Sequence, residues 1–175
     1  VHMPKGSTQT RFDNIQKEGA KVTIEEVNYD ECVRMAAADA AKTPNGVMVQ
    51  DTAWDGYEEI PAWIMQGYGT MSMEAAEQLK AAGCEAPTHI FVQAGVGSLA
   101  GSVQGFFANL FPNNCPTTVI VEAQAADCLY RSAAEKDGKI RFVEGDLQTI
   151  MAGLACGEAN TISLDILKNT SYFFV

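Results

Sequence analysis

Two largely apolar segments, residues 89–92 and 117–121, constrain the fold of this chain more than any other feature. A loop of small residues, 94–98, follows the first segment, and a predicted helix at 99–110 separates it from the second. Short apolar runs that alternate with helices are typical of βαβ units and a parallel sheet. Because neither run alternates between apolar and polar residues, both strands are expected to be buried on both faces. The predicted fold class is therefore α/β, with open parallel sheets and flanking helices.

The composition limits the kinds of molecule that the chain is expected to bind. The 175 residues are 47% hydrophobic and 19% charged, which is typical of a folded chain and not of a disordered one. A net charge of −10 argues against nucleic-acid binding and against an anionic membrane surface, because both favour Lys and Arg. No apolar run approaches the roughly 20 residues of a membrane helix. Five scattered cysteines without a CxxC pair predict no metal site and indicate reduced thiols in a cytoplasmic protein.

The chain is predicted to contain two lobes. Residues 1–70 are assigned to a smaller α/β lobe and residues 87–175 to a larger one, with a connecting helix or hinge at 71–86. Short strands are also expected at 47–49, where all three residues are apolar, and at 140–143. Hydroxyl and amide side chains favour helix N-caps. Such residues precede four of the predicted helices: Ser7, Asn28, Ser72 and Ser163.

The strongest candidate for a ligand site is the glycine loop, Ala94, Gly95, Val96, Gly97 and Ser98. It joins a strand to the start of a helix, where exposed backbone N–H groups and the helix dipole favour an anion. The glycines allow the backbone to approach a phosphate closely. A phosphate-bearing cofactor or substrate is therefore favoured over a plain strand–helix turn, because open α/β sheets bind ligands at this end.

Two other functions remain open at this point. Gly95 and Gly97 belong to a G-x-G-x-x-A pattern, and Glu122 follows the next strand, where a ribose-binding acid is expected. These residues fit an NAD-type dinucleotide-binding oxidoreductase domain. The second alternative is a regulatory α/β domain that binds a small molecule and has no enzymatic activity.

Two further segments are candidates for the ligand site. Asp51 follows the predicted strand at 47–49 and opens an aromatic loop, where a general base could face a ligand. Its alternative role is to cap the following turn, and composition alone favours that role. Residues 151–158 are mostly small and either line a pocket or form a glycine-capped helix end.

Six segments occur in the order and spacing of one enzyme family: residues 3–7, 50–54, 60–68, 93–97, 126–132 and 150–158. Together they closely resemble the diaminopropionate ammonia-lyases, pyridoxal-phosphate enzymes of the tryptophan-synthase-β-like class, fold type II. The resemblance covers essentially all 175 residues.

The resemblance implies a cytoplasmic, two-lobed homodimer that eliminates ammonia from 2,3-diaminopropionate and yields pyruvate. Its cofactor would be pyridoxal 5′-phosphate, with the phosphate on loop 94–98, and its partner a small amino-acid substrate. Asp51 matches an acidic position of the family that is thought to accept the α-proton of the substrate, so the resemblance favours a catalytic role for Asp51.

The same resemblance implies that the chain is incomplete at both ends. The Schiff-base lysine of the family lies upstream of residues 3–7, and a segment near the pyridine nitrogen lies downstream. We therefore expect the chain as given to be inactive alone. Cys128 and Cys156 fall in matched segments near the cofactor, where they either form a disulfide or remain two buried thiols.

Overall fold

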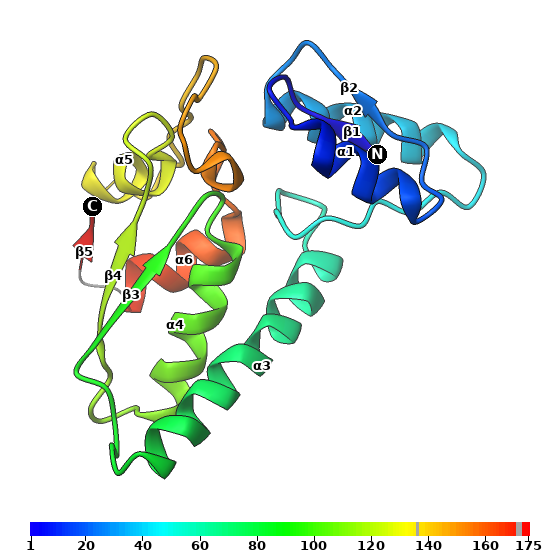
Figure 1. Ribbon diagram of the computed structural model, residues 1–175. Coiled ribbons are helices and arrows are strands. Elements are labelled where there is room, and N and C mark those ends of the chain that lie inside the picture. Colours follow the sequence, from blue (N-terminus) through cyan, green and yellow to red (C-terminus); the bar gives the residue numbers. More distant parts are fainter. Residues whose placement is uncertain (136, 171–172) are drawn as a thin grey trace.

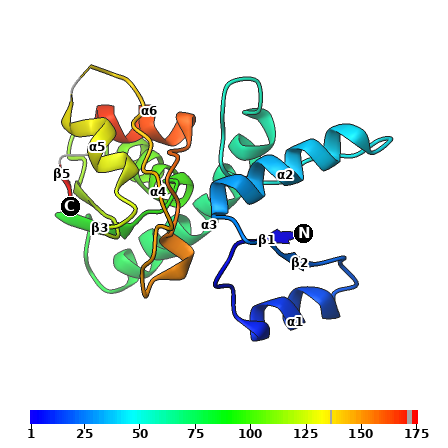
Figure 2. The ribbon, with the colours of Figure 1, turned by 90° about the horizontal axis from the view of Figure 1, so that it is seen from above.

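The computed structural model describes residues 1–135, 137–170 and 173–175, and Figure 1 shows helices and parallel strands arranged in two lobes. The smaller lobe contains the first two strands and the first two helices. The larger lobe contains a three-stranded sheet and the last three α-helices, and the long third helix runs along it. In Figure 2 the two lobes lie on opposite sides of the view, with the loop after α2 (Tyr29–Lys42) leading from one to the other. The predicted α/β class with parallel sheets is confirmed.

In the smaller lobe, strand β1 (His2–Met3) pairs in parallel with β2 (Thr23–Ile24), and the helices are α1 (Gln9–Lys17) and α2 (Tyr29–Lys42). Asn28 caps α2 as predicted, since its side chain accepts a hydrogen bond from the Glu31 N–H. The predicted cap of α1 was one residue early. Thr8, and not Ser7, accepts from the backbone of Arg11.

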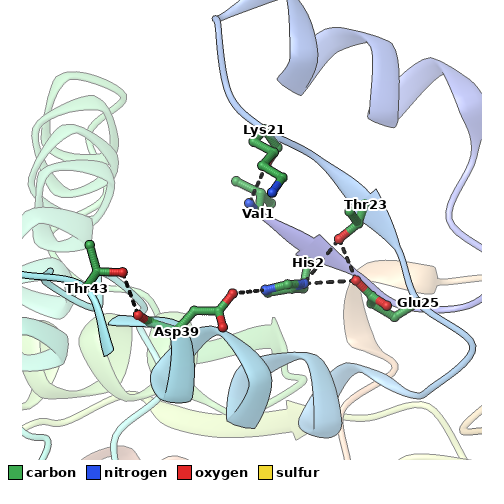
Figure 3. A network of polar contacts seen from close by, with 7 residues as sticks. All are labelled: Val1, His2, Lys21, Thr23, Glu25, Asp39 and Thr43. Carbon is green, nitrogen blue, oxygen red and sulfur yellow. Dashed lines mark hydrogen bonds and ion pairs between the residues drawn. The ribbon is translucent and has the colours of Figure 1, made fainter. Parts of the chain in front are cut away.

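His2 connects the two strands of the smaller lobe to α2 (Figure 3). Its Nδ1 lies 3.1 Å from Thr23 Oγ1 and 3.0 Å from Glu25 Oε1, while its Nε2 lies 3.0 Å from Asp39 Oδ2. These hydrogen bonds, to Glu25 first and then to Asp39, raise the pKa of His2 above its ordinary value. The imidazolium form therefore stabilises the packing of α2 on the small sheet.

Helix α3 (Glu59–Ala81) is continuous, so the predicted helix start at Ser72 was wrong. Ser72 is only 1% exposed and lies in the middle of the helix. The glycines at 67 and 69 each disfavour the helix by about 1 kcal/mol relative to alanine, but packing overrides that preference. Figure 1 shows α3 running alongside α4 (Ser98–Leu110), and Ser102 Oγ donates to the Met65 carbonyl at 2.6 Å across this contact.

The sheet of the larger lobe has the order β3-β4-β5 and is parallel throughout: β3 (His89–Gln93), β4 (Thr117–Val121) and β5 (Phe173–Phe174). Ile120 in the central strand is fully buried, as expected. The same expectation was wrong for β3: Val92 on one face of the strand is 6% exposed, but the opposite face is open. Phe91 is 72% exposed on its uncovered face.

Three helices complete the larger lobe: α4 (Ser98–Leu110), α5 (Cys128–Ala134) and α6 (Thr161–Thr170). The core packs Ile120, Leu129, Leu164 and Leu167 at 2% exposure or less. Helices α4 and α6 approach closely, since a Cβ added at Gly101 would lie 2.7 Å from Ser163 Cβ. A glycine is therefore required at this helix crossing.

Three other local predictions were wrong. Residues 47–49 are irregular, and Val47 and Val49 are 67% and 71% exposed, since no neighbouring strand covers them. Residues 140–143 are also irregular. Ser163 does not cap α6: its N–H donates to Asn160 Oδ1, so Asn160 is the cap. Within the described ranges, no helix has the length and apolarity needed to cross a bilayer.

Candidate active site

A cavity of about 240 Å³ lies at the carboxyl end of β3 and the start of α4. Its wall contains the whole stretch from residue 93 to residue 100, together with Asp51 and Tyr29. On the far side it is closed by Gly153, Leu154 and Cys156. The structure therefore brings the glycine loop, Asp51 and part of the 151–158 segment together, although they are far apart in the sequence.

The glycine loop has the geometry of an anion cradle. Gly97, at the N-cap of α4, has a φ of +98°, and an added Cβ would lie 2.8 Å from Ser163 Oγ. At Gly95 an added Cβ would meet Cys156 Sγ at 3.2 Å and Leu154 Cα at 3.3 Å. Since the first N–H groups of a helix have no intrahelical acceptor, these small residues present backbone donors at the cavity. The loop fits a phosphate group.

Asp51 is held by hydrogen bonds on its side chain and on its backbone. Tyr68 Oη donates to Asp51 Oδ2 at 2.8 Å, which joins the carboxylate to α3. Ser98 Oγ and Asn160 Nδ2 both donate to the Asp51 carbonyl oxygen at 2.8 Å. Asp51 is thus a partly buried carboxylate with a defined position in the cavity wall.

Two tyrosines beside Asp51 were missed by the sequence analysis. Burial, with the hydrogen bond to Asp51 as the second cause, raises the pKa of Tyr68 to about 12, so Tyr68 is a proton donor at neutral pH. Burial also raises the pKa of Tyr29, whose hydroxyl accepts from Gln50 Nε2 at 2.7 Å. Tyr68 lies in the matched segment 60–68, but neither residue stands in a pattern that indicates its partner.

Cys128 and Cys156 both lie near Gly95 of the glycine loop, and both are free thiols, so the disulfide hypothesis is not supported. Cys128 Sγ lies 3.7 Å from the Gly95 carbonyl oxygen, and Cys156 lines the cavity. Burial raises the pKa of Cys156 to about 12, with Asp30 and Asp51 adding to the effect. Burial also raises the pKa of Cys128, so both thiols are protonated at neutral pH.

Glu122 does not have the role that the dinucleotide hypothesis assigns to it. Its carboxylate is 8% exposed and accepts hydrogen bonds from the N–H groups of Leu129 and Tyr130 at 2.9 Å and 2.6 Å. It therefore caps α5 and has no free oxygen directed at a ribose. Burial raises the pKa of Glu122 to about 7.

A second cavity, of about 520 Å³, lies between α2 and the segment that precedes α6. Arg34, Trp54 and Phe142 are among its lining residues, whereas Asp51 and the glycine loop are not. The candidate active site is the smaller cavity, because only that one combines an anion cradle with a carboxylate. Among the described residues, no group of three His, Cys, Asp or Glu side chains is arranged to hold a metal ion.

Comparison with known proteins identifies the class that this fold and site define. The family model described as "Pyridoxal-phosphate dependent enzyme" matches residues 1–175. The chain therefore belongs to the family of pyridoxal-phosphate dependent enzymes, and the predicted cofactor, pyridoxal 5′-phosphate, and fold type II are confirmed.

Within this family, the chain is similar to diaminopropionate ammonia-lyases. It is 53% identical over 174 residues to the enzyme of Salmonella typhimurium and 46% identical over 175 residues to that of Escherichia coli K12. These alignments cover 99% and 100% of this chain and 43% of each relative. A crystal structure of the Escherichia coli enzyme in complex with an aminoacrylate-PLP azomethine reaction intermediate superposes with a TM-score of 0.88 at 45% identity, covering 99% of this chain and 43% of that one. The chain thus spans less than half the length of the relatives it matches.

Proposed function

We propose that the protein containing this chain is a pyridoxal-phosphate dependent ammonia-lyase that converts 2,3-diaminopropionate to pyruvate and ammonia by α,β-elimination. The observation that carries the proposal is the 53% identity to a diaminopropionate ammonia-lyase across 99% of this chain. The cavity supports it, because a phosphate cradle and a positioned carboxylate share one wall. We also propose a cytoplasmic homodimer with lobes at 1–70 and 87–175 joined by 71–86.

The residues of this chain have separate roles in that reaction. The backbone N–H groups of loop 94–98 bind the cofactor phosphate. When bound, the cofactor supplies an electron sink for the charge left on the α-carbon of the substrate. We assign Asp51 as the base that accepts the α-proton. Tyr68 donates to Asp51 Oδ2, which orients the carboxylate and leaves Oδ1 as the oxygen that receives the proton.

The proposal is tested on the purified full-length protein. We expect a visible absorption band that borohydride removes, and release of pyruvate and ammonia from D- or L-2,3-diaminopropionate. Serine and threonine, which lack the β-amino group, serve as comparison substrates. Bound cofactor without ammonia release from either enantiomer of diaminopropionate would contradict the proposed substrate while leaving the family intact.

A further inference from the structure

Asn160 lies where three segments of the chain meet, and its side chain is fully buried. Its Nδ2 group donates to the Asp51 carbonyl oxygen at 2.8 Å and to Ser98 Oγ at 2.9 Å. Ser98 Oγ in turn donates to the same carbonyl at 2.8 Å. The three groups therefore close a triangle of hydrogen bonds around the backbone of Asp51.

The other polar atoms of Asn160 bind the opposite side of the site. Its Oδ1 accepts from the Ser163 N–H at 3.0 Å, which caps α6. Its backbone N–H donates to the Val96 carbonyl at 2.8 Å. Val96 belongs to the glycine loop, so the backbone of Asn160 holds this loop next to α6. The side chain of Asn160 holds the Asp51 segment.

The partners leave one orientation for this amide. A rotation by 180° would place Oδ1 against the Asp51 carbonyl oxygen and leave the Ser163 N–H without its acceptor. Buried polar groups without partners are costly, so this orientation is strongly preferred. Asp51 itself lies outside any helix or strand, and its position therefore depends on these side-chain contacts.

We infer that Asn160 is a positioning residue that fixes Asp51 against the start of α4. It thereby sets the distance between the Asp51 carboxylate and the glycine loop. The inference rests on the proposed function, in which Asp51 accepts the α-proton. Asn160 acts through Asp51 and the loop and has no contact of its own with the reacting atoms. A displacement of a catalytic group by about 1 Å can lower the rate about 100-fold.

The test uses the full-length holoenzyme and the variants Asn160→Ala and Asn160→Asp. The aspartate variant keeps the size of the side chain and an acceptor for Ser163, but it replaces the donor that faces Asp51. The matched control is Gln104→Ala. Gln104 is also a fully buried amide, and it donates to the Thr170 carbonyl at 2.7 Å and accepts from Thr118, away from the cavity.

We expect both Asn160 variants to lower kcat by about 10- to 100-fold with KM and bound cofactor nearly unchanged. In an Asp51→Asn background, the same substitutions should lower kcat by less than about twofold, because the residue they position is already absent. Gln104→Ala should change kcat by less than about twofold even if it unfolds at a lower temperature. Equal losses at Asn160 and Gln104, or fully multiplicative losses with Asp51→Asn, would overturn the inference.

Hydrogen exchange gives a second measurement that does not need activity. Backbone amides of residues 50–54 should exchange faster in Asn160→Asp than in the wild type or in Gln104→Ala. If the wild-type protein releases no ammonia, the proposed reaction fails, yet this comparison still decides whether Asn160 holds the segment. Unchanged exchange at 50–54 would overturn the positioning role.

Discussion

Asp51 combines an acidic side chain with a backbone that is bound from two directions. Tyr68 holds Oδ2, and the Ser98 and Asn160 side chains hold the carbonyl oxygen. A turn-capping aspartate would instead bind N–H groups of the residues that follow it. The observed contacts leave part of the carboxylate facing the cavity, which is what a base requires.

Replacing Asp51 by asparagine should lower ammonia release by at least about 100-fold in the full-length enzyme, because the amide cannot accept the α-proton. Cofactor binding should persist, since the phosphate loop is untouched. Asp55→Asn is the matched control: Asp55 is exposed in the same loop and lines the other cavity. Ammonia release within a few-fold of wild type for Asp51→Asn would exclude its assignment as the base.

Gly97 should not tolerate a side chain. Alanine at a φ of +98° is strained, and its Cβ would lie 2.8 Å from Ser163 Oγ. We expect Gly97→Ala to destabilise the protein by about 1–3 kcal/mol and to weaken cofactor binding. Gly67→Ala is the control, because Gly67 lies in helix α3 with open space around it and the change should stabilise by up to about 1 kcal/mol. Chemical denaturation and cofactor titration measure both effects.

At the scale of single elements, the structure separates what the sequence could predict from what it could not. The glycine loop and α4 were predictable, because a strand end, small residues and a helix start adjoin in the chain. The continuity of α3 was not, since its packing on α4 overrides the local preference of Gly67 and Gly69. The role of Asn160 was equally hidden, because its partner Asp51 lies 109 residues away.

The unfolding stability should fall as pH rises through the titration of Glu122, which caps α5. Its pKa is raised from 4.5 to about 7, so the folded state holds the proton more tightly than the unfolded chain. The stabilisation of the folded state by the protonated Glu122 is fully present below pH 4.5 and is lost as pH rises through about 7. Glu122→Gln does not titrate, but its NH2 group cannot accept the second of the two backbone N–H groups that bind Glu122. The variant should therefore be less stable than the wild type near pH 5, and its stability relative to the wild type should rise by about 2–3 kcal/mol between pH 5 and pH 8.

The measurement is urea denaturation of both proteins across this pH range. Other titrating groups affect both proteins equally, so the difference between them isolates Glu122. A difference in unfolding free energy that does not change with pH would show that the carboxylate does not titrate near neutrality.

Helix α3 contains a buried hydroxyl group that contributes no hydrogen bond within the described residues. Ser72 Oγ has no hydrogen-bond partner among the described residues, and Ser72 is 1% exposed. Ser72→Ala removes this desolvated group and improves helix propensity, so we expect stabilisation by about 0.5–1 kcal/mol. Thermal unfolding of the full-length protein measures it. A loss of stability would indicate a partner for the hydroxyl.

At the scale of the whole molecule, helix α2 contacts the larger lobe through one buried hydrogen bond and one exposed ion pair. Asp30 is 6% exposed, and its Oδ2 accepts from the Gly157 N–H at 2.9 Å. Arg34 binds Glu158 at 2.6 Å, but both side chains of this pair are substantially exposed. Gly157 adjoins Cys156, so the contact from Asp30 reaches the far wall of the cavity.

The buried contact should contribute more than the exposed one. Asp30→Ala leaves the Gly157 N–H without its acceptor and should destabilise the protein by about 1–3 kcal/mol. Arg34→Ala removes an exposed ion pair and should cost less than about 1 kcal/mol. Comparing the unfolding free energies of the two variants tests this ranking, and hydrogen exchange at 153–158 should rise more in Asp30→Ala. The reverse order would show that the ion pair is the main link between the lobes.

Asp51 lies after α2 in the chain, and the contacts of its carboxylate and carbonyl oxygen come from α3, from the start of α4 and from Asn160, which precedes α6. A displacement of α2, whose Tyr29 lines the cavity, would therefore change the opening of the cavity more than the separation between the Asp51 carboxylate and the glycine loop. Entry of the substrate and release of the product would then depend on this opening, as a step separate from proton transfer. In such an enzyme, a viscous solvent slows the opening and leaves the chemical step as fast as in water.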